Sequence, residues 1–121
     1  MKQGQIVAVF NILKRFQDDI QLPNDISYAF FRLMQLVKDQ VDFQIKRQNK
    51  LAEKYHCHEG ENGLPVFEND DDARGYSEEL NELIDMDVDL GEYKKIPFKN
   101  DGRCNLSPRE LMILSDFFEY V

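Results

Sequence analysis

The chain has 121 residues, of which 42% are apolar and 31% are charged. That composition suits one globular domain with a modest core. No apolar run approaches the roughly 20 residues that cross a bilayer, and no basic segment leads into an apolar one, so we expect a cytoplasmic protein. Cys57 and Cys104 are too few for a disulfide framework, and we expect both to be thiols.

The formal net charge of −8 is unevenly distributed along the chain. Residues 1–58 contain nine Lys/Arg and six Asp/Glu, a net charge of +3, whereas residues 59–121 contain six and seventeen, a net charge of −11. An acidic chain binds nucleic acid poorly, because binding relies on basic side chains that displace counterions from the phosphates. The basic residues of the middle segment are expected to meet the acidic half of the same chain; they are Lys46, Arg47, Lys50 and Lys54.

The first predicted element is a helix over residues 5–20. Its apolar residues recur at steps of three and four, which is typical of a helix with one buried face; they are Ile6, Val9, Phe10, Leu13, Phe16 and Ile20. The link that follows is only three residues long, Gln21 to Pro23. Short links favour antiparallel neighbours, so this helix should pack against the next one as a hairpin.

The longest predicted element is a helix over residues 24–55. Pro23 ends whatever precedes it, and Asn24 or Asp25 can cap its first turn. An apolar stripe then runs without interruption by Gly or Pro, through Ile26, Phe30, Leu33, Val37, Val41 and Ile45. Such a helix is about 48 Å long at 1.5 Å per residue, which exceeds the width of a small domain. Its polar second half is expected either to lie against one other helix or to form a self-association seam.

The remaining chain predicts smaller elements. Residues 56–75 are rich in Gly and acids and are expected to form a loop, with Glu61–Gly63 as a turn and residues 64–67 as one strand of a two-stranded hairpin. A helix is predicted over residues 76–87 and an extended segment over residues 88–98, where Pro97 favours an edge strand or a loop. Residues 107–120 should form a closing helix, because Ser107 and Glu110 make a capping box around Pro108.

These elements predict a mostly α (α+β) fold in one domain of residues 1–121. Its architecture should be a long antiparallel helical hairpin, a small β element and a C-terminal helix that closes the core. The large aromatic side chains are expected to build this core rather than a ligand site.

One cluster contains the residue types that bind metals, His56, Cys57 and His58, with Glu59 and Glu61 close behind. Structural zinc sites draw ligand pairs from two separate places in a chain. The second place here offers only Cys104, since the chain has two His in total. A solvated loop is therefore favoured over a metal site.

The segment Asp70, Asp71 and Asp72 is similar to the start of a calcium-binding loop, with Gly75 at the sixth position. The similarity then fails, because Arg74 occupies a ligand position and Asn81 stands where a bidentate Glu belongs. We therefore expect no calcium site in this segment.

No residues assemble into a catalytic pattern. No Ser has a neighbouring His, and nothing around Cys57 would activate a thiolate. No glycine-rich loop follows a predicted strand, so phosphate binding is not indicated. We expect a protein that is not an enzyme and needs no cofactor.

The order of several short phrases resembles a family of small bacteriophage and prophage proteins that is classed as a domain of unknown function. These phrases are Leu22-Pro23, Leu51 to Tyr55, Glu61 to Gly63, Glu78 to Leu80, Val88 to Leu90 and Leu106 to Leu111. His56 to His58 departs from the family, in which a plain Gly- and acid-rich loop is expected. The resemblance covers nearly the whole chain and implies a phage origin and an architecture, with no catalytic residues.

The functional expectation is a non-enzymatic phage-type protein that binds another protein, in virion assembly or in modulating a host factor. Its partner would be a second copy or a host or phage protein, with no nucleic acid and no membrane, in the cytoplasm of the bacterial host. The candidate binding residues are Lys46, Arg47, Lys50, Asp70, Asp71, Asp72, Glu78, Glu79 and Glu82.

Two alternatives stay open. The first is an acidic inhibitor that mimics nucleic acid, using the same acids together with Asp85, Asp87 and Asp89. It predicts salt-sensitive binding to a basic partner, whereas a helix seam should be nearly indifferent to salt. The second alternative is a metal-binding module at residues 56–58.

Overall fold

The computed structural model describes residues 1–121 and is mostly helical. Its helices are α1 (Gln3–Arg15), α2 (Asn24–Lys54), α3 (Asp70–Asp85) and α4 (Pro108–Leu114). Its short strands are β1 (His58–Glu59), β2 (Pro65–Val66), β3 (Ile96–Phe98) and β4 (Phe118–Tyr120). The predicted mostly α fold with a small β content is confirmed.

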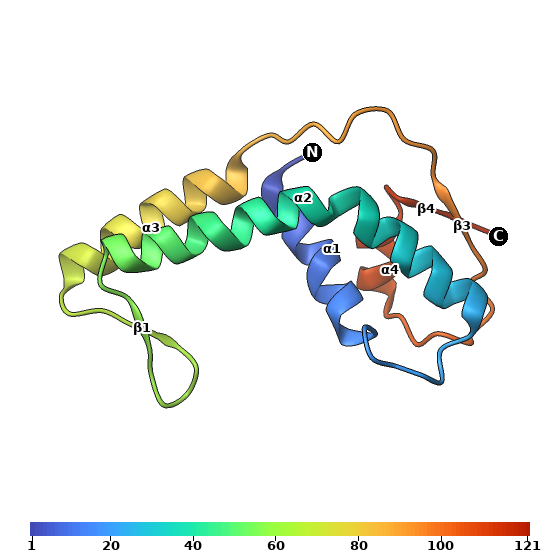
Figure 1. The fold of residues 1–121 in the computed structure, drawn as a ribbon, viewed down its shortest axis with the longest axis horizontal. Helices are drawn as coiled ribbons and strands as arrows, with labels where there is room; N and C mark the ends of the chain where they lie inside the picture. The colour runs from blue at the N-terminus through green and yellow to red at the C-terminus, as the bar shows by residue number, and fades with distance from the viewer.

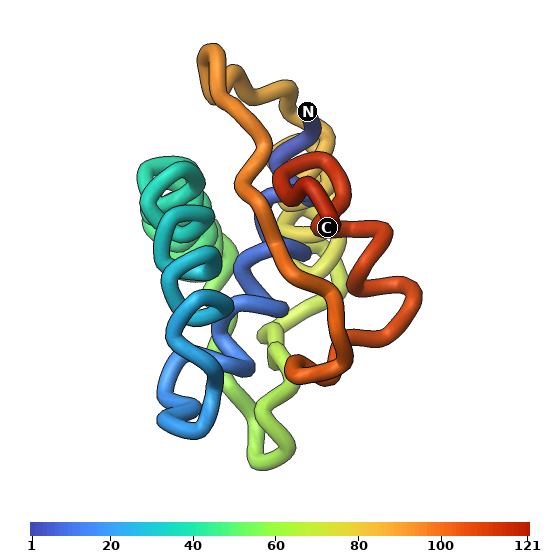
Figure 2. The backbone as a smooth tube through the Cα atoms, turned by 90° about the vertical axis from the view of Figure 1, so that its right-hand side faces the viewer, coloured from blue at the N-terminus to red at the C-terminus, as the bar shows by residue number.

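Helix α2 is the longest element, and the other elements lie along its two halves, with the start of α1 also contacting the end of α3 (Figure 1). Its N-terminal half packs with α1 and β3, whereas α3 runs back along its C-terminal half. In the end-on view, α1 lies between α2 and the C-terminal segment that contains α4 (Figure 2). Helix α2 ends within one residue of its predicted end.

The main core is built around the first half of α2. Four Phe rings form one cluster in this core. The ring centroid of Phe30 lies 5.4 Å from that of Phe16, 5.8 Å from that of Phe98 and 5.9 Å from that of Phe118. Sixteen buried residues belong to this core: Ile6, Val9, Ile12, Leu13, Ile26, Ala29, Phe30, Leu33, Val37, Val41, Ile96, Phe98, Cys104, Leu114, Phe117 and Phe118. Stacked Phe rings bury much apolar area, which is how a chain without Trp fills its core.

A second, smaller group of buried side chains lies between the second half of α2 and α3. We call it the distal cluster, and it consists of Leu51, Tyr76 and Leu83 with the partly buried Ala52, Tyr55, Phe67 and Leu80. Gly75 permits the close packing here, because a Cβ at this position would overlap the ring of Tyr55. The β1–β2 hairpin completes this end of the molecule, with His58 opposite Val66 and Glu59 opposite Pro65.

The prediction for the first helix was wrong at its C-terminal end. Helix α1 ends at Arg15 instead of residue 20, and residues 16–18 form a turn. Asp18 and Asp19 would place two negative charges at the negative end of the helix dipole. Ile20, which fitted the helical spacing, is 96% exposed because it lies in the link instead of on a helix.

The third helix begins six residues before its predicted start at Tyr76. Asn69 caps it, since its side-chain oxygen accepts a 2.8 Å hydrogen bond from the backbone N–H of Asp72. The acids of its first turn suit the positive end of the helix dipole. The segment expected to be a loop up to residue 75 is therefore helical from Asp70 onward.

The prediction of a closing helix over residues 107–120 was also wrong for the second half of that range. Its capping box is present, with Ser107 Oγ accepting from the Glu110 N–H at 3.2 Å and Glu110 Oε1 accepting from the Ser107 N–H at 2.9 Å. The helix nevertheless ends at Leu114, and β4 pairs in parallel with β3, with Ile96 opposite Phe118. Strand pairing places the ring centroid of Phe118 4.8 Å from that of Phe98 and leaves Val121 exposed.

Candidate functional site

An apolar hollow of about 290 Å³ opens at the end of the hairpin where α1 turns toward α2. Its polar lining residues, Gln17 and Ser27, carry no charge. Its apolar lining residues come from both helices and from the link between them: Leu13, Phe16, Leu22, Phe30, Phe31 and Met34. This composition suits an apolar side chain of a partner better than a charged ligand.

Two exposed aromatic side chains adjoin this hollow on α2. Tyr28 is 61% exposed and Phe31 55% exposed, and their rings stack with centroids 6.2 Å apart. Phe31 directly follows the buried Phe30, and neighbouring residues on a helix point about 100° apart, so both cannot face the core. We call the hollow together with Tyr28 and Phe31 the hairpin-end surface. Exposed apolar groups that lie side by side are common at protein interaction sites.

The basic candidate residues of α2 face solvent, and Arg47 among them also lies beside the acidic helix α3. Lys46, Arg47 and Lys50 are all exposed. One turn later, Lys54 Nζ lies 2.8 Å from Glu79 Oε1. The hydrogen bond from Lys54 lowers the pKa of Glu79, with a smaller contribution from the charge of Arg47, and the same bond raises the pKa of Lys54. The expected meeting of basic and acidic halves is therefore observed at this pair.

The acidic candidates of α3 have different surroundings. Asp70, Asp71, Glu78 and Glu82 are exposed, whereas Asp72 and Glu79 are half-buried. The segment that was similar to a calcium loop is the first turn of a helix, whose backbone carbonyls accept helical hydrogen bonds. It therefore cannot wrap a cation as such a loop does.

The three candidate metal ligands at residues 56–58 have different surroundings. His56 adopts a left-handed backbone with φ of +53°, and its Nδ1 lies 3.4 Å from Asp72 Oδ2. Cys57 and His58 instead line an open cleft of about 470 Å³ between α2 and the β1–β2 hairpin. The lining of the cleft mixes polar and apolar side chains, and in it Gln48 Nε2 lies 3.5 Å from the Tyr76 hydroxyl.

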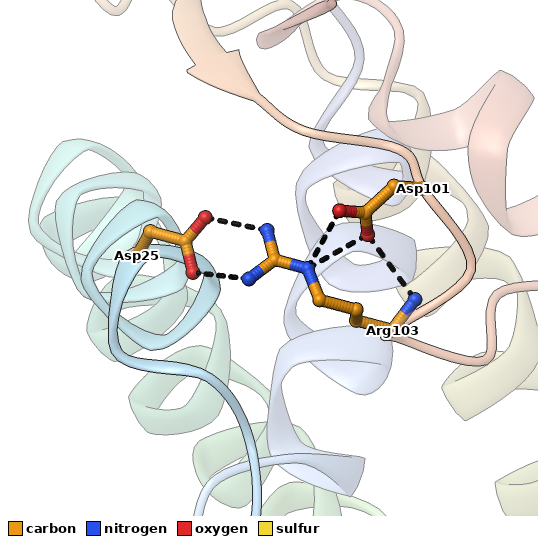
Figure 3. Close-up of polar contacts among 3 residues, drawn as sticks. All are labelled: Asp25, Asp101 and Arg103. Carbon is orange, nitrogen blue, oxygen red and sulfur yellow. Dashed lines mark hydrogen bonds and ion pairs between the residues drawn. The ribbon is translucent and has the colours of Figure 1, made fainter.

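A polar cluster near the start of α2 ties that helix to the loop before α4 (Figure 3). Arg103 Nη1 and Nη2 lie 3.1 and 2.6 Å from the two carboxylate oxygens of Asp25, and its Nε lies 2.7 Å from Asp101 Oδ2. Hydrogen bonds from Arg103 lower the pKa of both carboxyl groups. Neither Asn24 nor Asp25 caps α2, because Pro23 occupies the cap position and Asp25 pairs with Arg103 instead.

Both cysteines are free thiols, as expected. Cys104 is part of the main core, and its burial raises the pKa of its thiol. A thiol held in its neutral form is a poor nucleophile, so Cys104 is a packing residue.

Comparison with known proteins identified no relative: no protein-family model, curated protein or solved structure matches the chain. None of the helices combines the length and the apolar character that crossing a bilayer requires.

Sequence reasoning missed the hairpin-end surface, although a signal for it existed. Tyr28 and Phe31 lie off the apolar stripe of α2, and large aromatic residues on the polar side of a helix indicate an exposed patch. It also missed the approach of Asp72 to His56, which depends on α3 starting at Asp70. The capping residue Asn69, followed by three Asp, was the available signal for that start.

Proposed function

We propose that this protein is a non-enzymatic, phage-type protein that acts by binding another protein through its hairpin-end surface. Such binding would serve virion assembly or the modulation of a host factor in the bacterial cytoplasm. The single observation that carries the proposal is the exposed, stacked pair of Tyr28 and Phe31 beside an uncharged hollow.

The chemistry of this surface defines the partner that fits it. A hollow between two helices, lined by Leu, Phe and Met, accepts large apolar side chains such as those on one face of an amphipathic helix. Exposed aromatic residues supply much of the binding free energy in such interfaces. Because no charged side chain lines the hollow, binding should depend little on salt.

The acidic helix α3 supports a second candidate, a mimic of nucleic acid that binds a basic protein. Asp70, Asp71, Glu78, Glu82 and Asp85 are exposed along it. Binding through these carboxylates would weaken steeply with salt, which separates the two candidates.

The experiment begins by replacing Phe31 with a photo-crosslinking amino acid in cells of the host bacterium. The matched control places the same crosslinker at Met112, an exposed residue of α4. Protein adducts that form at position 31 and are absent at position 112 would identify the partner. The partner is then purified. A crosslink between two copies of the chain would make the partner a second copy.

Affinity for the purified partner is then measured for Phe31→Gln, Tyr28→Gln and the control Met112→Gln. We expect the two aromatic substitutions to raise Kd about tenfold or more and the control to leave it unchanged, because truncating aromatic anchors costs more than about 1.4 kcal/mol. Unchanged affinity in both aromatic variants would refute the proposal. If affinity instead falls steeply as salt is added, and falls in Glu78→Gln and Glu82→Gln, the protein acts as a nucleic-acid mimic and the proposal for the hairpin-end surface is wrong.

A further inference from the structure

Three side chains that can bind a metal converge where α2, the β1–β2 hairpin and α3 meet. His56 follows the end of α2, Glu68 lies between β2 and α3, and Asp72 lies in the first turn of α3. One ligand atom from each lies within 4.8 Å of the other two. The three residues come from separate segments, so their convergence is produced by the fold.

We propose that His56, Glu68 and Asp72 form a binding site for a divalent transition-metal ion, with zinc as the ion that fits best. Zinc binds imidazole nitrogen and carboxylate oxygen at about 2.0–2.2 Å, so ligand atoms around one ion lie roughly 3.4 Å apart. His56 Nδ1 and Asp72 Oδ2 already lie 3.4 Å apart. His56 and Glu68 are exposed, so their side chains are free to rotate toward an ion.

The composition of the site selects among ions. Magnesium and calcium prefer oxygen ligands and need more of them than these three residues supply. An imidazole beside two carboxylates suits zinc and its neighbours in the first transition row. A cation would also neutralise two carboxylates that otherwise repel each other in a chain of net charge −8.

The backbone of His56 is the one place where a residue other than Gly has a positive φ. This conformation is unfavourable for most residues and tolerated best by Asn, Asp and His. Here it accompanies the approach of the imidazole to Asp72. The site thus differs from the metal-binding module considered as an alternative at residues 56–58, because Cys57 and His58 line the cleft beside the hairpin.

An ion at this position would stabilise one end of the molecule. Its ligands would join the end of α2, the hairpin exit and the start of α3, the elements around the distal cluster. That cluster has three buried residues, against sixteen in the main core. An ion that binds the folded form alone stabilises it by mass action, and here the stabilisation should be local to α3.

The test titrates zinc chloride into the metal-free full-length chain by calorimetry, with magnesium and calcium chloride in parallel. His56→Asn removes the imidazole while keeping a residue that tolerates the left-handed backbone, and Asp72→Asn removes the carboxylate charge. The matched control is His58→Ala, which removes the other exposed His. Hydrogen exchange of the α3 amides is measured for each protein with and without zinc.

We expect one zinc ion per chain and no saturable binding of magnesium or calcium. His56→Asn and Asp72→Asn should each raise Kd for zinc at least tenfold, and His58→Ala should leave it within twofold. Zinc should slow exchange in α3 for the unmodified chain and not for His56→Asn. Cobalt(II) bound in place of zinc should give no thiolate charge-transfer band, because Cys57 is not a ligand.

Three outcomes would overturn the proposal. The first is the absence of saturable zinc binding to the unmodified chain. The second is zinc binding that survives His56→Asn and is lost in His58→Ala or Cys57→Ser, which would place the ion in the cleft. The third is zinc binding that leaves exchange in α3 unchanged. None of these outcomes bears on partner binding at the hairpin-end surface, so the two proposals fail separately.

Discussion

The two halves of α2 support regions that are held together differently. The main core surrounds the first half with sixteen buried residues from five elements, and its centre is a cluster of Phe rings. The distal cluster surrounds the second half with three buried residues, and at its margin the exposed Lys54 pairs with the half-buried Glu79. Since buried apolar area dominates stability, the distal end should open more easily than the main core.

Between the two regions, α2 packs through polar side chains. Gln3 is fully buried and donates from Nε2 to the Gln40 carbonyl at 2.9 Å, while its Oε1 has no partner. Gln44 is also buried, and its Oε1 has no partner either. Burying a polar amide stabilises a fold less than burying an apolar side chain of similar size. The junction therefore contributes less than an apolar seam would, which favours independent opening of the distal end.

The largest expected effect separates the two regions directly. Phe98→Ala removes a ring from the centre of the main core and should lower the free energy of unfolding by about 3–5 kcal/mol. Leu83→Ala in the distal cluster should instead speed hydrogen exchange of the α3 amides while the main core stays folded. Urea unfolding followed by circular dichroism measures the first effect, and hydrogen exchange of the α3 and α1 amides measures the second. Equal loss of protection in α1 and α3 for Leu83→Ala would mean that the two regions unfold as one unit.

A smaller effect should come from the close approach of α3 to Tyr55. In Gly75→Ala the new Cβ would overlap the Tyr55 ring, and overpacking of this kind costs about 1–3 kcal/mol. Hydrogen exchange in α3 should become faster while exchange in α4 stays the same. The control is the double variant Gly75→Ala/Tyr55→Ala, in which the obstructing ring is gone. If the alanine at position 75 destabilises α3 equally with and without the ring, crowding at Tyr55 is not the cause.

The smallest effect concerns acid stability, because most of the charged groups in the ion pairs are exposed. In the folded protein the pKa values of Asp25 and Asp101 lie below their usual value, owing to Arg103, and the pKa of Glu79 is lowered by Lys54. The unfolded chain then binds more protons than the folded one in this range. The stabilisation is therefore complete above the unfolded pKa values of about 4 and is lost as pH falls through the folded ones.

The measurement compares urea midpoints between pH 7 and pH 2.5 for Arg103→Gln and Lys54→Gln. Arg103→Gln should reduce the drop in global midpoint on acidification, because its pairs tie α2 to the loop before α4. Lys54→Gln should leave that drop nearly unchanged and alter only the acid dependence of exchange in α3. If both variants shift the global midpoint equally, the ion pairs do not distinguish the two regions.

Periodicity predicted α2 well because a buried stripe at helical spacing leaves few alternatives for so long a segment. It failed at the end of α1, where Ile20 continued the spacing although Asp18 and Asp19 oppose the helix dipole. It failed again after Leu114, where Phe117 and Phe118 fit a helix as well as a strand. The pairing of β4 with β3 decided between a helix and a strand, and no local feature of residues 118–120 reveals a partner located 22 residues earlier.

The candidate surfaces were less predictable than the fold. The charges of Lys54 and Glu79 suggested an internal match, which α3 provides by packing along α2. The hairpin-end surface depends on where α1 stops, and the approach of His56 to Asp72 depends on where α3 starts. Errors of five or six residues at these two ends were enough to hide both sites.

By itself, the sequence determined the elements that local forces can specify: the long helix α2, the β1–β2 turn at Glu61–Gly63 and the capping box at Ser107. In each, residues within a few positions of one another supply the hydrogen bonds or the apolar pattern that specifies the element. The tertiary structure alone decided the parallel pairing of β3 with β4, the division into main core and distal cluster, and the meeting of His56, Glu68 and Asp72. These features join segments that are distant in the chain, and they depend on apolar burial between segments, which no single segment contains.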